Sequence, residues 1–380
     1  MDAGDRIRLP LFVEASRQLT ICNACRYCEG LCAVFPALER RTVLAARDIT
    51  QIANLCHDCR ACFDACMYTQ PHEFAINLPR ALSAIRVEDY AHYTWPRRMP
   101  RIFRGWLGLF AGALLTSVLV LLLAVGHSGW SGLVSPNGAA PGSPYDLIPY
   151  GELLALLLVA SGYSMVVLAL AARSYWRTVA DDGLEVSTAA LLRATWYAAT
   201  LRYLRGGDVE CYYPKQDTPT AARRRWHSLV FYGMTLCFVS TLAAAVLQDV
   251  LHQDPPYSLL SVPVATGTIG GLGLLAGSVG LIALKSHAEP ATSFRDMTVK
   301  DYGLLVALTF LALSGLATLL TRSTSAFGVV FLVHLASVVL AFASAPYSKL
   351  SHGVFRFAAL IRDNVEREDL EHRIRGRSSG

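Results

Sequence analysis

The sequence CNACRYCEGLC (residues 22–32) is followed by CHDCRACFDAC (residues 56–66), which repeats its cysteine spacing. The two runs contain eight of the ten cysteines in this 380-residue chain. The spacing C-x₂-C-x₂-C-x₃-C is typical of chains that bind two [4Fe–4S] clusters, in which the fourth cysteine of each run ligates the other cluster. We therefore predict two ligand sets, which are Cys22, Cys25, Cys28 and Cys66 for one cluster, and Cys56, Cys59, Cys62 and Cys32 for the other.

Two other uses of these cysteines fit the sequence less well. Zinc sites usually draw their ligands from two separated pairs, and neither run divides in that way. Disulfides would suit a secreted domain, but residues 1–21 contain no apolar stretch that would serve as a signal peptide. The segments at 36–41 and 48–55, which lie between the runs, read as short helices. We expect a helical ferredoxin domain with two [4Fe–4S] clusters over residues 1–96.

The rest of the chain is too apolar for an ordinary soluble protein. Hydrophobic residues make up 53% of the sequence and charged residues 17%, with a mean hydropathy of +0.37. A membrane-spanning helix needs about 20 mostly apolar residues. Six segments qualify, at 103–125, 150–172, 227–249, 260–284, 302–321 and 327–347. The sequence therefore predicts an all-α protein, in which a six-helix transmembrane bundle (97–350) and a cytoplasmic C-terminal tail (351–380) follow the ferredoxin domain.

The positions of lysine and arginine predict how these elements lie in the membrane. Arg193, Arg202 and Arg205 interrupt a further apolar stretch, so we expect residues 183–206 to form an amphipathic helix on the membrane surface. The loop at 126–149 has no Lys or Arg, whereas the opposite ends of the spans are rich in both. The positive-inside rule then places the iron–sulfur domain and both termini in the cytoplasm. The arginines flank apolar segments instead of forming a stripe with aromatics, so nucleic acid is not an expected partner.

Three histidines lie where a membrane cofactor would need ligands. His227 opens the third span, His334 lies inside the sixth, and His352 follows at the end of that segment. On one continuous helix, the 18 residues from His334 to His352 make five turns and separate them by about 27 Å along one face. His227 and His352 lie at the same, cytoplasmic level, which favours bis-histidine ligation of one haem b. The alternative is that both are interfacial histidines in contact with lipid headgroups or water.

His334 is a functional candidate because an ionisable residue inside a span is costly. It would either ligate a second haem or hydrogen-bond a quinone. His252 lies about 37 Å beyond His227 along a helix, which does not match the 27 Å offset, so a second bis-histidine haem is possible but not favoured. We expect Cys237 to be a small buried apolar residue. The sequence GLGLLA at 271–276 resembles a dinucleotide-binding fingerprint but sits within a span, so close helix packing explains it better.

The chain resembles the tricarballylate-utilisation protein B family, also called citrate-utilisation protein B, over nearly its whole length. The resemblance rests on the cysteine runs and on QPHEFAINLPRAL (70–82), RWHSLVFYG (225–233) and PYSKLSHGVFRFAAL (346–360). The membrane half is also similar to the haem-bearing γ subunit of nitrate reductase, which has two histidines 18 residues apart on a helix. That subunit has a second histidine ten residues after its counterpart of His227, where this chain has Cys237.

The resemblance implies an electron-transfer role at the inner membrane. Family members are described as multi-pass proteins with two [4Fe–4S] clusters and haem b. They reoxidise the FADH₂ of a soluble tricarballylate dehydrogenase and pass the electrons to the quinone pool. An alternative is a membrane redox sensor or scaffold that uses its clusters without turnover. A transporter is a weaker alternative, because the spans lack the paired acidic or unwound features that transport sites usually have.

Overall fold

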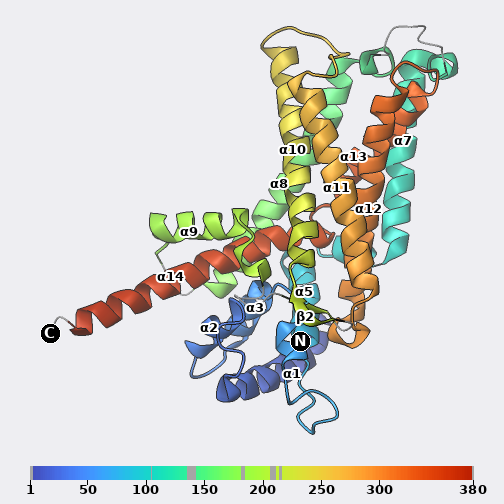
Figure 1. Ribbon diagram of the computed structural model, residues 1–380. Coiled ribbons are helices and arrows are strands. Elements are labelled where there is room, and N and C mark those ends of the chain that lie inside the picture. The colour runs from blue at the N-terminus through green and yellow to red at the C-terminus, as the bar shows by residue number, and fades with distance from the viewer. Residues whose placement is uncertain are drawn as a thin grey trace.

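A computed structural model describes residues 3–103, 105–134, 143–180, 185–205, 211–213 and 216–378, and nearly all of its regular structure is helical (Figure 1). The predicted all-α architecture is confirmed. Among the described residues, the exception is a short antiparallel hairpin formed by β1 (Cys211–Tyr213) and β2 (Gln216–Thr220).

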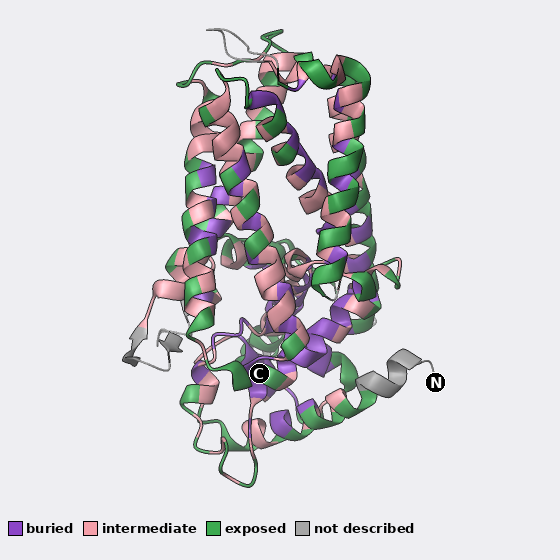
Figure 2. Ribbon diagram, turned by 90° about the vertical axis from the view of Figure 1, so that its right-hand side faces the viewer, coloured by how far each residue is buried: buried purple, intermediate pink, exposed green. Residues whose placement is uncertain are grey.

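The six predicted spans are confirmed as helices long and apolar enough to cross a membrane. They are α7 (Trp106–Gly132), α8 (Tyr150–Val179), α10 (Ala222–Asp249), α11 (Val262–Ser286), α12 (Arg295–Thr321) and α13 (Phe327–Ser344). Large apolar side chains such as Leu114, Val159 and Leu242 are exposed on this bundle, whose outer faces are extensively exposed in Figure 2. Lipid instead of water is the solvent that suits such a surface, so the chain is a multi-pass membrane protein.

Helices α10 and α11 pack closely because glycines line their contact. A Cβ added at Gly233 would lie 2.7 Å from the backbone nitrogen of Leu274, and one at Gly277 would lie 2.7 Å from the carbonyl oxygen of Trp226. A Cβ at Gly271 would lie 3.3 Å from Leu316 of α12. The interpretation of residues 271–276 as a packing motif is confirmed, and this packing holds α10, which carries His227.

The cysteine-bearing module lies at one end of the bundle (Figure 1). Its helices are α1 (Ala3–Cys25), α2 (Val34–Glu39), α3 (Ala46–Leu55), α4 (Ala61–Asp64), α5 (Leu78–Tyr93) and α6 (Met99–Ile102). Helices α2 and α3 confirm the short helices predicted between the cysteine runs. Helix α5 begins after Asn77, whose side chain accepts a hydrogen bond from the amide of Arg80 at 3.2 Å, a standard N-cap.

The chain after the sixth span differs from the sequence prediction. Helix α13 ends at Ser344, a 3₁₀ turn η4 (Lys349–Ser351) follows, and His352 starts a separate helix, α14 (His352–Ser378). Pro346 has no amide hydrogen with which to continue the helical ladder. The expectation that His334 and His352 lie five turns apart on one helix is therefore wrong.

Two helices lie across the end of the bundle instead of running through it (Figure 1). One is α14, and the other is α9 (Thr188–Ala199), which is followed by the 3₁₀ turn η2 (Arg202–Arg205). The helix predicted within residues 183–206 is thus confirmed over 188–199. Two further 3₁₀ turns, η1 (Pro144–Asp146) and η3 (Pro290–Thr292), precede α8 and α12.

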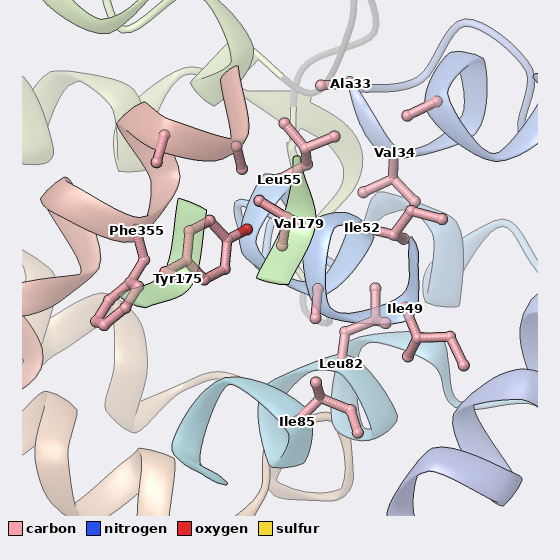
Figure 3. Packing of buried hydrophobic residues seen from close by; sticks show 14 of the residues in the cluster. Ala33, Val34, Ile49, Ile52, Leu55, Leu82, Ile85, Tyr175, Val179 and Phe355 are labelled. Carbon is pink, nitrogen blue, oxygen red and sulfur yellow. The ribbon is translucent and has the colours of Figure 1, made fainter. Parts of the chain in front are cut away.

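A single hydrophobic core joins the cysteine-bearing module to α8 and α14 (Figure 3). Tyr90 of α5 stacks on Phe355 of α14 with ring centroids 5.0 Å apart, and Tyr93 meets Tyr175 of α8 edge-on at 5.5 Å. Such aromatic pairs contribute about 1 kcal/mol each beyond their burial. The module is therefore packed onto the membrane half and is not held by a linker alone.

Buried ion pairs reinforce the same junction. Arg41 lies 2.7 Å from Glu366 of α14, and Asp48 of α3 lies 3.1 Å from Arg362 of α14. Arg40 also pairs with Asp363. These side chains retain at most 17% of their exposure, so each charge depends on its partner to offset the loss of water.

Candidate functional site

The backbone turns sharply inside both cysteine runs. Cys22 and Cys25 occupy the last turn of α1, and Arg26 then adopts a left-handed conformation with φ of 55°. In the second run, Asp58 and Arg60 are left-handed, with φ of 56° and 68°. A left-handed residue other than glycine costs about 1–2 kcal/mol and persists where the surrounding structure determines it.

The first predicted ligand set is gathered in space. Burial, followed by repulsion from Cys66, Cys28 and Cys25, raises the pKa of Cys22 to about 12. Burial, followed by repulsion from Cys66 and Cys25, raises the pKa of Cys28 to about 11. These four cysteines, with Cys62, line one small cavity. The metal-free thiols of Cys22 and Cys28 would therefore stay protonated at neutral pH, and a positively charged iron core would supply the charge that stabilises thiolates.

The second predicted set is gathered in the same way. Burial, and then the charges of Cys59 and Cys56, raise the pKa of Cys32 well above its usual value. Burial, Cys59, Cys32 and Cys56 do the same to the pKa of Cys62. No group of three or more His, Cys, Asp or Glu within the described ranges is arranged to hold a single metal ion. The donor chemistry of both sets, four thiols each, fits the cubane clusters predicted from the sequence.

The two cysteine sets differ in their surroundings. Cys25 of the first set is exposed, whereas Cys59 of the second set is buried. Backbone amides point at sulfur in both, because Asp58 donates to Cys56 Sγ and Tyr68 donates to Cys66 Sγ, each at 3.4 Å. Exposure and hydrogen bonds to sulfur are two of the factors that set cluster potentials.

His227 and His352 face each other although they come from different helices. Their ring centroids are 6.5 Å apart and their planes stand at 89°. With metal–nitrogen bonds of about 2 Å, two imidazoles on opposite sides of one iron have centroids about 6 Å apart. The observed spacing therefore fits a bis-histidine haem iron.

The hydrogen bonds of His352 suit a metal ligand. Its Nδ1 lies 2.6 Å from the carbonyl oxygen of Lys349 and donates to it, which leaves Nε2 as the free acceptor. Burial, and then the charges of Arg356 and Lys349, lower the pKa of His352 well below its usual value, so its imidazole is neutral. The Nδ1 atom of His227 is buried without a hydrogen-bond partner among the described residues.

Both histidines line a cavity of about 390 Å³ at the junction between the module and the bundle. Its walls include apolar side chains, among them Val230, Phe231, Leu304 and Leu308. Its polar part contains more cations (Arg60, Arg86, Arg223, Lys285, Lys349 and Arg356) than carboxylates (Asp58, Asp64, Glu289 and Asp301). Apolar walls suit a porphyrin ring and the cations suit its carboxylates, so the chemistry of the cavity fits haem b.

His334 occupies a different, largely apolar cavity of about 850 Å³ within the bundle. Its Nδ1 lies 3.1 Å from Ser314 Oγ, which lies 3.3 Å from Ser337 Oγ. A Cβ at Gly315 would lie 2.9 Å from the imidazole, so this glycine leaves room for the ring. Among the described residues that line this cavity, His334 is the one histidine.

Two other residues considered in the sequence analysis are His252 and Cys237. His252 lies exposed in the loop after α10. Cys237 borders the larger cavity and packs against α11, where a Cβ at Gly270 would lie 3.0 Å from its sulfur. This contact agrees with the packing expected of Cys237, although the residue is half-buried and not fully buried as predicted.

Several side chains that line the cavity of His227 and His352 were not identified from the sequence. His57 borders it, and burial, followed by the charges of Arg356 and Arg223, lowers the pKa of this histidine well below its usual value. Asp301 lies 2.5 Å from Lys285 and 2.8 Å from Lys349. The sequence offered a signal for His57, because this residue lies between the predicted ligands Cys56 and Cys59. It offered no signal for the ion pairs of Asp301, because their partners lie far apart along the chain.

Comparison with known proteins identifies the family. The family description "Citrate utilization protein B" matches residues 107–372, and "Citrate utilization protein B Fer4-like domain" matches residues 15–92. The chain belongs to the citrate utilization protein B family. It is 35% identical over 368 residues to the Escherichia coli protein named "Citrate utilization protein B", covering 97% of this chain and 94% of that protein. No solved structure matches it. The Fer4-like domain agrees with an iron–sulfur electron-transfer role.

Proposed function

We propose that this chain is a membrane electron-transfer subunit that carries electrons from the FADH₂ of a partner dehydrogenase to quinone. In this proposal the two cysteine sets hold [4Fe–4S] clusters, and His227 and His352 hold haem b. When bound, these groups supply one-electron carriers, which can accept the two electrons of a reduced flavin one at a time. The name of the Escherichia coli relative supports a partner that acts in tricarboxylate use, similar to tricarballylate dehydrogenase.

One observation carries the proposal. Cys59, a predicted cluster ligand, lines the same cavity as His227 and His352. Electron transfer weakens steeply with distance, so a relay needs its carriers held side by side. A cavity shared by the two ligand types meets that need.

The chain's own residues give the relay a direction. The exposed position of Cys25 makes the first set the side that a flavoprotein can approach. The burial of Cys59, which lines the cavity of His227 and His352, supports the second set as the one nearer the bundle. His352, which lines the shared cavity, donates from Nδ1 to Lys349, and this bond fixes the ring and leaves Nε2 free to bind iron.

The cavity around His334 supports quinone binding. A quinone has an apolar ring and tail with carbonyl oxygens as hydrogen-bond acceptors. The apolar lining accommodates the first, and His334, which is held by Ser314, supplies a polar group for the second. The absence of another histidine from the described lining favours this role over a second bis-histidine haem.

The proposed orientation puts the module in the cytoplasm, with three units at 1–96, 97–350 and 351–380. The basic residues near the shared cavity, including Arg223 and Lys349, lie on the module's side of the bundle. The positive-inside rule assigns that side to the cytoplasm. A reducing compartment also keeps cluster thiolates available.

Anaerobic purification followed by visible and EPR spectroscopy tests the function. We expect a b-type Soret band and cluster signals, both of which respond when a water-soluble quinol analogue or the reduced flavoprotein is added. Cofactors that are present but never exchange electrons with quinone would contradict the proposal and favour the redox sensor.

A further inference from the structure

We propose that Arg223 and Arg356 are positioning residues that hold the second cysteine run (residues 56–66) beside His227 and His352. Their charges also set the reduction potential of the cluster that this run would hold. This inference rests on the proposed function. The step concerned moves one electron from the reduced cluster to the haem iron, so the cluster is oxidised and the iron is reduced. No bond is made or broken.

Arg223 of α10 holds the backbone between two predicted cluster ligands. Its Nη2 donates to the carbonyl oxygen of His57 at 2.8 Å, and its Nη1 donates to the carbonyl oxygen of Asp58. The planar guanidinium thus uses two donors on adjacent carbonyls of one loop, a geometry that the single ammonium of lysine does not reproduce.

Arg356 of α14 holds the same loop from another helix. Its Nη2 donates to the carbonyl oxygen of Cys56 at 2.7 Å. Arg86 of α5 approaches that oxygen at 3.4 Å and donates to the carbonyl oxygen of Ala53 at 3.0 Å. Three cations from three helices therefore surround the backbone of Cys56, His57 and Asp58.

Each clamping arginine lies one helical turn from a predicted haem ligand. Arg223 precedes His227 by four residues on α10, and Arg356 follows His352 by four residues on α14. Residues four apart share a helix face and are about 6 Å apart along the axis. Each of the two helices therefore contacts the cysteine run and presents its histidine from the same face.

This arrangement has two separable consequences. The positive charges favour the more negative, reduced state of the cluster, which raises its potential relative to the first cluster. The two-pronged hydrogen bond of Arg223 fixes the distance from the cluster to the haem. Charge governs the potential, and hydrogen-bond geometry governs the rate.

The test uses the full-length holoprotein with Arg223→Gln, Arg356→Gln and Arg223→Lys. Arg225→Gln is the matched control, because Arg225 is an exposed arginine on the same helix. Iron and haem contents are measured first. EPR-monitored redox titration then gives the cluster potentials, and stopped-flow spectroscopy gives the rate at which photoreduced flavin reduces the haem.

We expect both glutamine variants to retain the haem and to shift the potential of one cluster to more negative values. We expect haem reduction to slow by about tenfold, because a loosened loop would hold the cluster less closely to the haem and the driving force would change. Arg223→Lys should restore the potential but not the rate, and Arg225→Gln should match the wild type.

Wild-type potentials and rates in both glutamine variants would overturn the inference, as would an equal change in Arg225→Gln. A glutamine variant that fails to assemble leaves Arg223→Lys as the test, and a wild-type rate in that variant would also overturn it. These results differ from failure of the proposed function, which would appear as a wild-type protein without haem or without cluster-to-haem transfer.

Discussion

The imidazole rings of His227 and His352 lie with their centroids 6.5 Å apart and their planes nearly perpendicular. The two residues come from helices of different orientation, α10 in the bundle and α14 across its end (Figure 1). Close packing of α10 on α11 and the shared core beneath α14 hold both rings in place. The pair is therefore a product of the tertiary fold.

Replacing either histidine should remove the haem. We expect His227→Ala and His352→Ala to lose the b-type Soret band while keeping their iron–sulfur signals, because each removes one proposed haem ligand and leaves the cysteine runs intact. His287→Ala is the control, since His287 is exposed and hydrogen-bonds only locally, with Ala283 and Ser286 among its partners. An unchanged Soret band in both test variants would show that the haem is held by other residues.

The sequence predicted the elements of this fold well. Apolar length alone identified six spans, because a helix in lipid must satisfy its own backbone. The cysteine spacing predicted that these sulfurs lie close together, as they do in the structure, while their division into two ligand sets stays a prediction. Apolar length and cysteine spacing are both patterns within short segments, so these predictions needed no knowledge of contacts between distant segments.

The errors and omissions came from tertiary contacts. The turn after Ser344 removed His352 from the sixth helix, although its level next to His227 was predicted from the order of the spans. The carbonyl oxygens of His57 and Asp58 meet Arg223 across more than 160 residues of sequence. Such pairs have no periodicity along the chain, so neither spacing nor composition reveals them.

Substitution of a ligand in one cysteine set should remove the cluster of that set and leave the other cluster in place. Cys25→Ser and Cys59→Ser should each reduce the iron from about eight atoms to about four per chain, because in the proposal each set would hold its own cluster. Cys237→Ala should retain all of it, since this cysteine packs within the bundle. Iron assay and EPR of anaerobic preparations measure the result. A full complement of iron in either serine variant would refute the proposed ligand sets.

Filling the space beside His334 should impair quinone use. In Gly315→Ala the new Cβ would lie 2.9 Å from the imidazole and displace it. We expect the KM for a soluble quinone to rise by about tenfold, equivalent to 1.4 kcal/mol, with an unchanged haem spectrum. Gly162→Ala is the control, because nothing lies within 4 Å of its added Cβ. Loss of a second haem signal in Gly315→Ala would instead indicate ligation by His334.

The buried ion pairs should hold the module to the bundle. Arg362→Ala leaves Asp48 buried without one of its partners, and we expect a destabilisation of about 3 kcal/mol. Arg373→Ala, on the same helix, removes an exposed pair with Asp369 and should cost less than about 1 kcal/mol. Thermal unfolding in detergent, with hydrogen exchange of α3, compares the two. Equal effects would contradict a structural role for the junction.

The central claim is that electrons pass from the clusters through a haem held by His227 and His352 to quinone. The direct test mixes fully reduced protein anaerobically with a soluble quinone, and follows the haem by stopped-flow absorbance and the clusters by freeze-quench EPR. In the wild type we predict that haem and clusters are reoxidised in one connected process. In His352→Ala the clusters should remain reduced, and their reoxidation at the wild-type rate without haem would contradict the account.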